Sequence, residues 1–471
     1  MSQNSTEPRV AVAGGGLAGL AAACALADSG FRVCLYERRP YLGGRASSYE
    51  HPGTAEVVDN CQHVLFRVCT NLVEFYRRIG VEDRIRWYED MTFIEPGGRA
   101  SVMHASALPA PLHTAPSFLR FPFLSAKDKL MIARAIAALT LRPQPDTGQS
   151  FQQWLLRRGQ TENAIQRFWK PILVSALSED LDLISISYAA QVVRESMKSP
   201  AARHMGVPSI PLTELYDRAG DYIRARGGEI HLRNSLESFL PEPGRVQIRV
   251  GDGEADFDFL VLALPFDGLA RVLPAGPEAA PLRDQLSHFE ASPITGIHLW
   301  FDRQISDLDH AVLLNRTAQW MFHKSRLLAG RNGASKGTSS GSYIEIVVSA
   351  SKNLIDKSRA EIIELAVKEV REFFPAARAA NLVKSTVIKE VYATYSPRPG
   401  IDAYRAQQAT VWPRVFLAGD WTATGWPATM EGAVRSGYLA AEALARVAGV
   451  TSPRFLAADL PASGLMRLFA V

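Results

Sequence analysis

The spacing of apolar residues in the first forty positions predicts a strand, a tight turn, a helix and a second strand. Residues 9–13 form a short apolar run, and residues 17–29 are rich in alanine, a strong helix former, before Gly30 ends the run. Residues 31–36 form another apolar run, which stops at Glu37. This order is that of a βαβ unit, the opening of a nucleotide-binding α/β fold.

Two later parts of the chain contain strands of the same apolar kind. Residues 227–232, 246–250 and 256–263 are predicted strands, and the last becomes fully apolar, as a strand entering a buried sheet does. Residues 414–418 predict one more strand, and a helix is predicted over 430–447. We therefore expect three separated segments to build one nucleotide-binding domain.

The stretches between these segments differ in pattern. Residues 71–204 are predicted to be mostly helical, with helices over 127–141 and 151–168. Residues 276–404 predict strands at 294–301 and 343–348, a helix at 358–374 and a flexible loop at 330–341. The predicted boundaries are 1–70, 205–275 and 405–447 for the nucleotide-binding domain, 71–204 and 276–404 for an inserted α+β substrate domain, and 448–471 for a C-terminal tail.

Composition excludes several classes of protein. Hydrophobic residues make up 47% and charged residues 21% of the 471 positions, as in ordinary folded proteins of two or three domains. The 52 basic and 48 acidic residues are scattered, so we expect no nucleic-acid partner. Four cysteines without CxxC spacing predict no metal site and a reducing, cytoplasmic location. Since no apolar run reaches 18 residues and the polar start is unlike a secretory signal, we expect a soluble protein or one at the inner face of the cell membrane.

The turn between the first strand and helix carries a GxGxxG pattern at Gly14, Gly16 and Gly19. Such a turn brings backbone N–H groups and the start of a helix against a pyrophosphate. Glu37 ends the next strand, where a carboxylate can accept hydrogen bonds from ribose hydroxyls. The pattern predicts a bound dinucleotide and leaves the choice between NAD and FAD open.

Two further motifs resemble the superfamily of flavin-containing amine oxidases and phytoene desaturases. One is Glu37-Arg38-Arg39-Pro40-Tyr41-Leu42-Gly43-Gly44-Arg45-Ala46, and the other spans residues 415–437. The resemblance implies FAD and a Rossmann-like FAD-binding domain of the amine oxidase/phytoene desaturase type, with the helix after 429 pointing its N-terminus at the flavin. The residues implied to bind FAD are Gly14, Gly16, Leu17, Ala18, Gly19, Glu37, Arg38, Gly43, Gly44, Arg45, Gly419, Asp420, Thr429 and Met430.

Residues 417–437 are similar, more narrowly, to the hydroxysqualene dehydroxylases, squalene-associated FAD-dependent enzymes of hopanoid pathways; residues 59–63, 168–171 and 394–400 fit the same family more loosely. This resemblance implies removal of the allylic hydroxyl of hydroxysqualene to give squalene, with reduced FAD as the hydride donor. Two alternatives stay open. One is an FAD-dependent desaturase of carotenoid type, acting on phytoene or squalene, and the other is a flavoprotein scaffold for terpene synthases without redox activity.

Loss of an allylic hydroxyl requires an acid, because hydroxide is a poor leaving group. His63 is the first candidate, since in the superfamily its segment passes near the flavin, although a histidine in apolar surroundings is commonly a satisfied core residue. Glu345 interrupts an apolar strand and is the second candidate, with the solvated face of an edge strand as the alternative. Tyr395 is the third. Candidates for the substrate pocket, or else ordinary core residues, are Trp320, Phe322, Trp421 and Trp426.

Two apolar stretches suggest how a water-insoluble triterpene would reach the protein. Residues 108–124 are apolar, interrupted by prolines, and followed by Lys127 and Lys129, and residues 465–471 are apolar with one cation. Related enzymes dock on membranes through their helical domain, so peripheral membrane contact through Phe118, Phe121 and Phe123 is expected, with internal packing as the alternative. The resemblance also implies contact with enzymes like squalene synthase.

The sequence predicts non-covalent flavin, because no Cys or His stands at an attachment position within the flavin motifs. The purified protein should be yellow, and acid precipitation should release the colour into the supernatant. Yellow colour that stays in the pellet would show a covalent bond.

Overall fold

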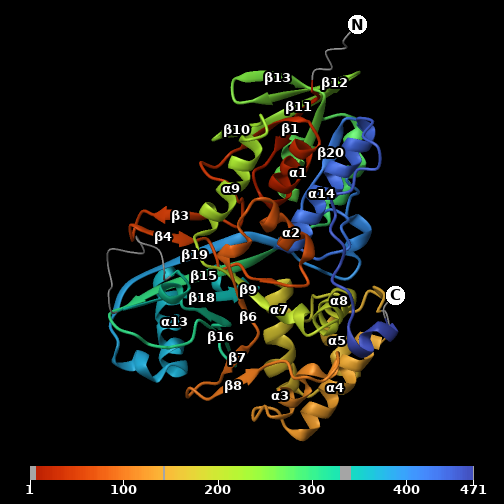
Figure 1. Cartoon of the computed structure of the whole chain (residues 1–471). Coiled ribbons are helices and arrows are strands. Elements are labelled where there is room, and N and C mark those ends of the chain that lie inside the picture. The colour runs from red at the N-terminus through yellow and green to blue at the C-terminus, as the bar shows by residue number, and fades with distance from the viewer. Residues whose placement is uncertain (1–6, 142–143, 329–340, 470–471) are drawn as a thin grey trace.

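The computed structural model describes residues 7–141, 144–328 and 341–469 (Figure 1). Of the predicted flexible loop at 330–341, only Gly341 belongs to the described residues. The chain forms two regions built on separate sheets, with α1 (Leu17–Asp28) and α14 (Met430–Val447) in one, and α13 (Arg359–Phe373) in the other (Figure 1).

The first region is built on a five-stranded parallel sheet. Its strand order is β10 (Glu229–Leu232), β2 (Arg32–Glu37), β1 (Arg9–Ala13), β14 (Phe259–Leu262) and β20 (Val415–Leu417). These strands come from three separated parts of the chain, which confirms the predicted α/β fold with its parallel nucleotide-binding sheet. Helix α1 is apolar on all sides and buried from Leu17 to Ala27, since α14 covers it; a Cβ on Gly437 would lie only 2.2 Å from the carbonyl oxygen of Ala18.

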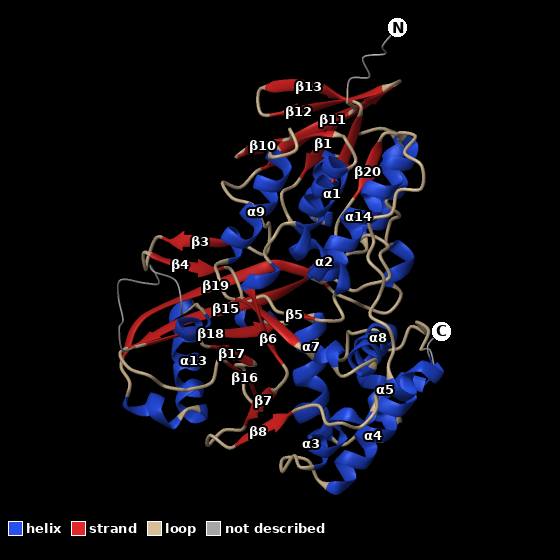
Figure 2. Ribbon diagram, in the orientation of Figure 1, coloured by secondary structure: helices blue, strands red, loops and turns tan. Residues whose placement is uncertain are grey.

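The second region is built on a seven-stranded sheet. Its order is β19 (Leu382–Tyr395), β15 (Ala291–Phe301), β18 (Ser342–Ser349), β17 (Trp320–Phe322), β16 (His310–Leu313), β7 (Met91–Ile94) and β8 (Ala100–Met103). Helix α13 packs on one face and α7 (Lys170–Leu177) contacts the other, which looks toward the helices drawn at lower right (Figure 2).

Alternation along β18 decides which side chains face each way. Ile344, Ile346 and Val348 pack with the apolar side of α13. Val347 instead belongs to the core on the opposite face, and Glu345 shares its direction because successive residues of a strand point to opposite faces. This alternation places a carboxyl group inside the molecule.

Three sequence predictions are wrong in their element boundaries. Residues 71–204, predicted to be mostly helical, also contain the strands β6 (Ile85–Tyr88), β7 and β8, and β7 pairs in parallel with β16. The single helix predicted at 151–168 is divided into α5 (Phe151–Arg157), α6 (Glu162–Ala164) and a π-helical turn, Ile165–Trp169. Gly159, at a φ of 69°, ends the first piece, and the Thr161 side chain caps the second.

The strand predicted at 256–263 is two strands. β13 (Gly253–Phe257) pairs antiparallel with β12 (Arg245–Val250), whereas β14 enters the parallel sheet. Asp258 separates them, and its carboxylate accepts a hydrogen bond of 2.8 Å from the backbone N–H of Arg9. The remaining elements are β3 (Ser48–His51), β4 (Glu56–Asp59), β5 (Leu65–Phe66), β9 (Met205–Pro208), β11 (Leu236–Glu242), α2 (Thr70–Arg78), α3 (Ala115–Leu119), α4 (Ala126–Leu141), α8 (Ile186–Met197), α9 (Leu212–Arg224), α10 (Phe266–Val272), α11 (Ala280–Ser287) and α12 (Lys324–Leu327).

The phenylalanines of the apolar stretch at 108–124 are packed inside. Phe118, Phe121 and Phe123 are all buried, and the rings of Phe121 and Phe123 stack with their centroids 4.8 Å apart. The expectation that these three side chains touch a membrane is therefore wrong. Among the helices of the described part of the chain, none combines the length and apolarity needed to cross a membrane.

Candidate functional site

Two glycine turns touch each other at the carboxyl ends of β1 and β2. The N–H of Gly43 donates to the carbonyl of Gly15 at 2.9 Å, and a Cβ on Gly44 would lie 2.9 Å from the Cα of Gly16. A Cβ on Gly19 would lie 1.9 Å from the carbonyl oxygen of Gly14. Backbone approaches this close leave room only for glycine. The structure thus brings together the two glycine motifs that the sequence predicts for the cofactor.

The N-terminus of α1 begins in this cradle without a partner from any described side chain. Gly16 is its N-cap residue, no side chain caps it, and the first turn contains no acidic residue. Leu17, Ala18 and Gly19 are all buried there. A buried helix start without a cap leaves N–H groups and a positive dipole end for an anion, which is what the pyrophosphate of a dinucleotide such as FAD supplies.

The buried carboxylate of Glu37 accepts hydrogen bonds from the backbone of the cradle. It is 6% exposed; one carboxylate oxygen accepts the N–H of Gly15 and the other that of Arg39, both at 2.7 Å. The Arg39 guanidinium in turn donates to the carbonyl of Gly44 at 2.7 Å, a contribution that the sequence analysis missed. Arg38, by contrast, is exposed. Glu37 therefore fixes the first glycine turn, and its contact with ribose stays a prediction.

An ion pair joins the first and the last segments of the predicted FAD-binding domain. Arg45 donates to the Asp420 carboxylate at 2.8 Å and to the carbonyl of Ala393 at 2.8 Å. Burial by itself lowers the pKa of Arg45, but the Asp420 carboxylate outweighs burial and raises it, so the guanidinium stays charged. Gly419, just before Asp420, donates its N–H to the Ser436 hydroxyl at 2.8 Å.

The start of α14 is capped by its own sequence. Thr429 is the N-cap residue, and its hydroxyl accepts the N–H of Gly432 at 3.1 Å. Met430 is the first helical residue, and its sulfur accepts a hydrogen bond of 3.7 Å from the Tyr216 hydroxyl. The helix therefore begins where the flavin motif predicts.

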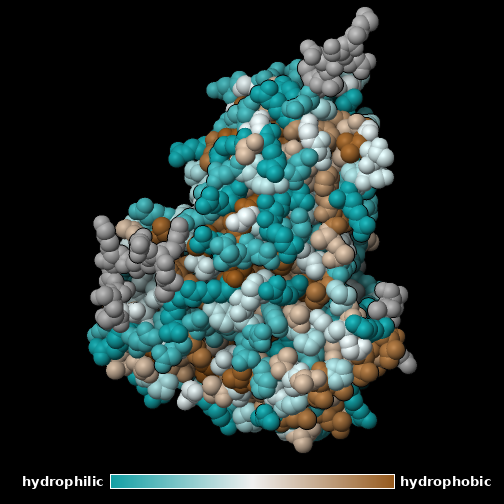
Figure 3. All heavy atoms as spheres, in the orientation of Figure 1, coloured by the Kyte–Doolittle hydropathy of each residue, from teal (hydrophilic) through white to brown (hydrophobic). Residues whose placement is uncertain are grey.

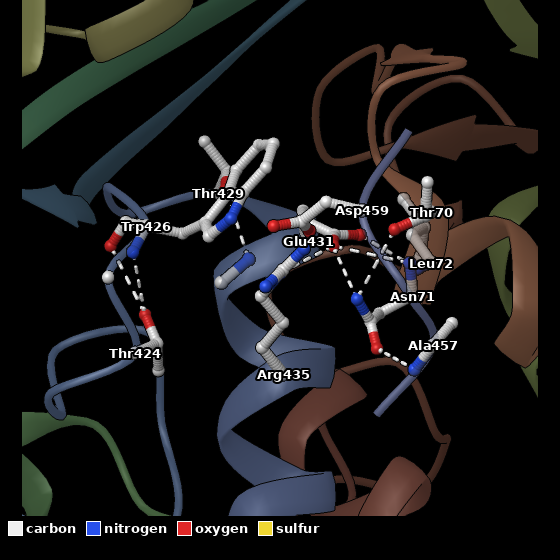
Figure 4. A network of polar contacts seen from close by, with 12 residues as sticks. Thr70, Asn71, Leu72, Thr424, Trp426, Thr429, Glu431, Arg435, Ala457 and Asp459 are labelled. Carbon is white, nitrogen blue, oxygen red and sulfur yellow. Dashed lines mark hydrogen bonds and ion pairs between the residues drawn. The ribbon is translucent and has the colours of Figure 1, made fainter. Parts of the chain in front are cut away.

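Glu431 ties this helix start to two other parts of the chain (Figure 4). Its buried carboxylate accepts the N–H groups of Asn71 at 3.2 Å and Leu72 at 2.8 Å, at the start of α2, and the Arg435 guanidinium at 2.6 Å. Arg435 also pairs with Asp459 of the C-terminal segment. One carboxylate thus stabilises the N-terminal ends of two helices, a role that the sequence analysis missed although Glu431 lies within the flavin motif.

His63, the first candidate acid, is half-buried, and its Nδ1 lies 2.8 Å from the carbonyl oxygen of Cys61. Burial lowers the pKa of its imidazole below the ordinary value. The ring is therefore neutral at pH 7. A neutral imidazole whose N–H donates to a carbonyl is poorly suited to protonate a leaving group.

Glu345 is fully buried within β18, an interior strand, so its interpretation as the solvated face of an edge strand is wrong. Its Oε1 accepts the N–H of Gln62 at 2.6 Å, and its Oε2 has no hydrogen-bond partner among the described residues. Burial raises the pKa of this carboxyl to about 8. Burial thus favours the protonated form of Glu345, whereas the Lys324 ammonium, 3.8 Å from Oε2, favours the ionised form.

Tyr395 belongs to a buried hydrogen-bond network that reaches the flavin motif at Asp420. Its hydroxyl lies 3.1 Å from that of Tyr188, which donates to Asp402 at 2.6 Å, and Arg405 reaches from there to the carbonyl of Asp420 at 3.1 Å. Burial raises the pKa of Tyr395 to about 12. These contacts favour a supporting role, and its role as an acid stays a prediction.

Lys324 and Asp59 lie beside Glu345, and the sequence analysis missed both. The Lys324 side chain is 2% exposed; its Nζ lies 2.6 Å from an Asp59 oxygen, 2.8 Å from the side-chain oxygen of Gln62 and 3.8 Å from Oε2 of Glu345. No spacing in the sequence connects these residues, since they belong to distant elements.

The four predicted pocket residues lie in separate parts of the structure. The rings of Trp320 and Phe322 stack in parallel with their centroids 5.6 Å apart. Phe322 of β17 lies directly opposite Glu345 of β18 in the antiparallel pair. Trp421 fills the core and donates to the carbonyl of Leu264, whereas Trp426 is half-buried under the Arg435 guanidinium. Trp320 and Phe322 thus share the Glu345 side of the sheet, and contact of all four with substrate stays a prediction.

One group of metal-ligating side chains occurs in the described residues, at Cys34, Glu229 and His231. Arg32 donates to Glu229 at 2.7 Å and occupies one of its carboxylate oxygens. We therefore assign no metal to this group.

Comparison with known proteins agrees with this geometry. A family model described as flavin containing amine oxidoreductase matches residues 17–445. A 15-cis-phytoene desaturase of Synechococcus elongatus is 29% identical over 93% of this chain and 95% of its own, and a zeta-carotene desaturase of Synechocystis sp. is 26% identical over 93% and 97%. The structure of cyclohexylamine oxidase from Brevibacterium oxydans superposes with a TM-score of 0.66 at 17% identity, covering 94% of this chain and 99% of that one.

Replacing Glu37 by alanine is expected to raise the dissociation constant for FAD about tenfold or more. A hydrogen bond to a charged group contributes about 1.5–3 kcal/mol, and this carboxylate accepts two from the cradle. FAD titration of the apoprotein measures the change. Glu229→Ala, which removes an exposed carboxylate from the neighbouring strand, is the control. An unchanged dissociation constant for Glu37→Ala would remove this residue from the site.

Proposed function

The chain belongs to the family of flavin-containing amine oxidoreductases, and from this premise we propose that it acts on a long apolar isoprenoid in the manner of the carotenoid desaturases. It is an FAD-dependent oxidoreductase, and the cradle, the uncapped start of α1 and the Arg45–Asp420 pair fit FAD. The observation that carries the desaturase assignment is the similarity to a 15-cis-phytoene desaturase over 93% of this chain and 95% of that one.

When bound, FAD supplies two-electron chemistry: the oxidised form takes a hydride from carbon, and the reduced form returns one. In desaturation the substrate would give up a hydride from one carbon and a proton from its neighbour to water, so that a C=C bond forms, and the two electrons would pass on to an acceptor of the quinone class. The task of the protein is to bind an apolar chain and exclude water. The buried side chains of Trp320, Phe322 and Val347 make the Glu345 face of the sheet apolar.

A second candidate function is reductive removal of the allylic hydroxyl of hydroxysqualene, and the state of Glu345 favours it. A protonated, buried acid with one oxygen free of hydrogen bonds is suited to give a proton to a leaving hydroxyl. The C–O bond breaks, the oxygen leaves as water, and the hydride completes the new C–H bond. Abstraction of hydride from an unfunctionalised polyene has no leaving oxygen to protonate.

We also propose that the substrate enters from an anionic membrane surface. Leu108, Leu112 and Leu119 are 44–61% exposed, and Leu468 of the C-terminal 3₁₀ turn (Gly464–Phe469) is 77% exposed. The two segments lie together, since the N–H of Leu465 donates to the carbonyl of Ala110 at 2.8 Å. Figure 3 shows apolar residues gathered at this end of the molecule.

Basic side chains border these leucines. Arg120, Lys127 and Arg467 are exposed, and Lys129 donates to the carbonyl of Leu119 at 2.8 Å. Apolar side chains ringed by cations match the interface of an anionic bilayer. The contact with synthases implied by the resemblance stays a prediction.

The direction of the reaction separates the candidate functions. Oxidised protein with phytoene or squalene and a quinone should yield a product with additional double bonds if the desaturase proposal holds. Anaerobic protein reduced with dithionite should convert hydroxysqualene to squalene if the second candidate holds. Product mass identifies each, and absence of both products, with bound FAD, would leave the scaffold alternative.

For dehydroxylation the expected pH dependence follows from Glu345. Only the protonated acid donates, so the rate should fall as pH rises through about 8. Glu345→Gln should slow this reaction roughly 10²–10⁴-fold while His63→Ala retains it. The reverse ranking would return the role of acid to His63.

Replacing Leu108, Leu112 and Leu468 together by serine should lower co-sedimentation with anionic vesicles about tenfold or more, since burial of one leucine contributes about 1.5–3 kcal/mol. FAD content should not change. The matched control replaces Leu240, Val383 and Val411, exposed elsewhere on the molecule. If both triple variants bind vesicles like the parent protein, this surface does not dock on membranes.

A further inference from the structure

We propose that Lys324 and Asp59 are positioning residues that hold Glu345 with one oxygen bound and one oxygen free, and that their opposite charges set the pH range in which Glu345 keeps its proton. The inference rests on the proposed function only in assigning a use to that proton. Neither residue belongs to the flavin motifs.

The geometry of the cluster is that of a buried charge pair beside a neutral acid. Asp59 ends β4 and accepts Lys324 at 2.6 Å on one oxygen, and on the other it accepts the Ser48 hydroxyl at 2.6 Å and the N–H of Leu212 at 3.2 Å. These contacts lower the pKa of Asp59 despite burial, and the Asp59 carboxylate raises the pKa of Lys324 although burial lowers it. The pair is therefore charged, and its charges compensate each other within the core.

Gln62 connects this pair to Glu345. The Lys324 ammonium donates to the side-chain oxygen of Gln62 at 2.8 Å, and the backbone N–H of Gln62 donates to Glu345 Oε1 at 2.6 Å. Oε2 lies 3.8 Å from Lys324, beyond hydrogen-bond distance. One oxygen of Glu345 is thus fixed by the turn, and the other is left to carry the proton.

The same turn reaches the cofactor cradle. The Asn60 side-chain amide donates to the carbonyl of Arg45, and its oxygen accepts the N–H of Cys61 at 3.0 Å. A Cβ on Gly296 would lie 3.3 Å from the carbonyl oxygen of Asn60 and 3.5 Å from Glu345 Oε1. The turn at 59–63 therefore bridges the Gly-Gly-Arg segment and the sheet that carries Glu345.

The other titratable groups around Glu345 are neutral. Burial lowers the pKa of His298, its partner across β15 and β18, to about 3, and the Nδ1 of His298 lies 2.8 Å from the Tyr343 hydroxyl. Burial also raises the pKa of the Cys61 thiol and of the Tyr343 phenol well above their ordinary values. The charges that act on Glu345 at close range are therefore Lys324, which favours its ionised form, and Asp59, which opposes it.

The test uses two substitutions that must act in opposite directions. Lys324→Met removes the cation 3.8 Å from Glu345 and should raise the pKa of Glu345 by about one unit or more, whereas Asp59→Asn should lower it. Infrared difference spectra of the FAD-loaded protein, recorded against pH, follow the carbonyl stretch of the protonated acid. Glu345→Gln identifies that band by removing it.

Lys384→Met, which removes a half-exposed lysine from its pair with Glu56, is the matched control and should leave the band unchanged. The double variant Lys324→Met/Asp59→Asn removes both buried charges at once. It replaces the single variants in the measurement if one of them fails to fold. It should retain the Glu345 band, with a pKa between those of the single variants. Shifts in the same direction, or no shift, would overturn the proposal.

The infrared measurement does not require turnover, so it separates this proposal from the proposed function. Opposite shifts without conversion of any isoprenoid would uphold the charge pair and contradict the proposed function. If an isoprenoid is converted but neither substitution shifts the pKa of the Glu345 band, the proposed function would be upheld and the charge pair contradicted. Where hydroxysqualene is converted, the fall in rate at high pH should move with the band, upward in Lys324→Met.

Discussion

The buried, uncapped N-terminus of α1 is the constraint on which the nucleotide-binding region depends. A helix start in the interior leaves N–H groups that need an anion, and here the helix itself is covered by α14 and contains no polar side chain in its first turn. The neighbouring backbone must approach within contact distance, which explains the glycines at 14, 19 and 44. Glu37, Arg39 and the Arg45–Asp420 pair then hold the loops around the space for the pyrophosphate.

A second polar group connects the two sheets. The turn at 59–63 lies between the cofactor cradle and the larger sheet, and it forms hydrogen bonds with Lys324 and Glu345. These are ionisable side chains, whereas an apolar substrate would favour apolar ones. Buried charges are costly unless they are paired, and Asp59 with Lys324 meets that condition. Burial favours the neutral form of the remaining acid, Glu345, which shares its face of the sheet with the aromatic residues Trp320 and Phe322.

The relatives are desaturases and therefore favour oxidation of the substrate, although a bound flavin can also return hydride. Sequence identities of 26–29% to desaturases extend over nearly the whole chain, which agrees with an apolar isoprenoid substrate. The raised pKa of Glu345 is a local property and agrees better with loss of an oxygen. The two observations concern different parts of the chemistry, and Trp320 and Phe322 lie on the same face of β17 and β18 as Glu345.

The sequence by itself determined the cofactor cradle, because its requirements are local: glycines where the backbone bends or meets another chain segment, and an acidic residue at the end of a strand. Helix α1 and strand β1 could be predicted for the same reason, since each is an apolar run between clear stop signals, and α14 could be predicted although it also contains charged residues such as Glu431 and Arg435. Only the tertiary structure decided that Glu345 is buried, that Phe118 points inward and that Lys324 meets Asp59. Each of these facts depends on contacts between parts of the chain that are far apart in the sequence, such as the pairing of β18 with β17 or the ion pair of Lys324 with Asp59. No local spacing in the sequence records which face of an element another part of the chain will cover.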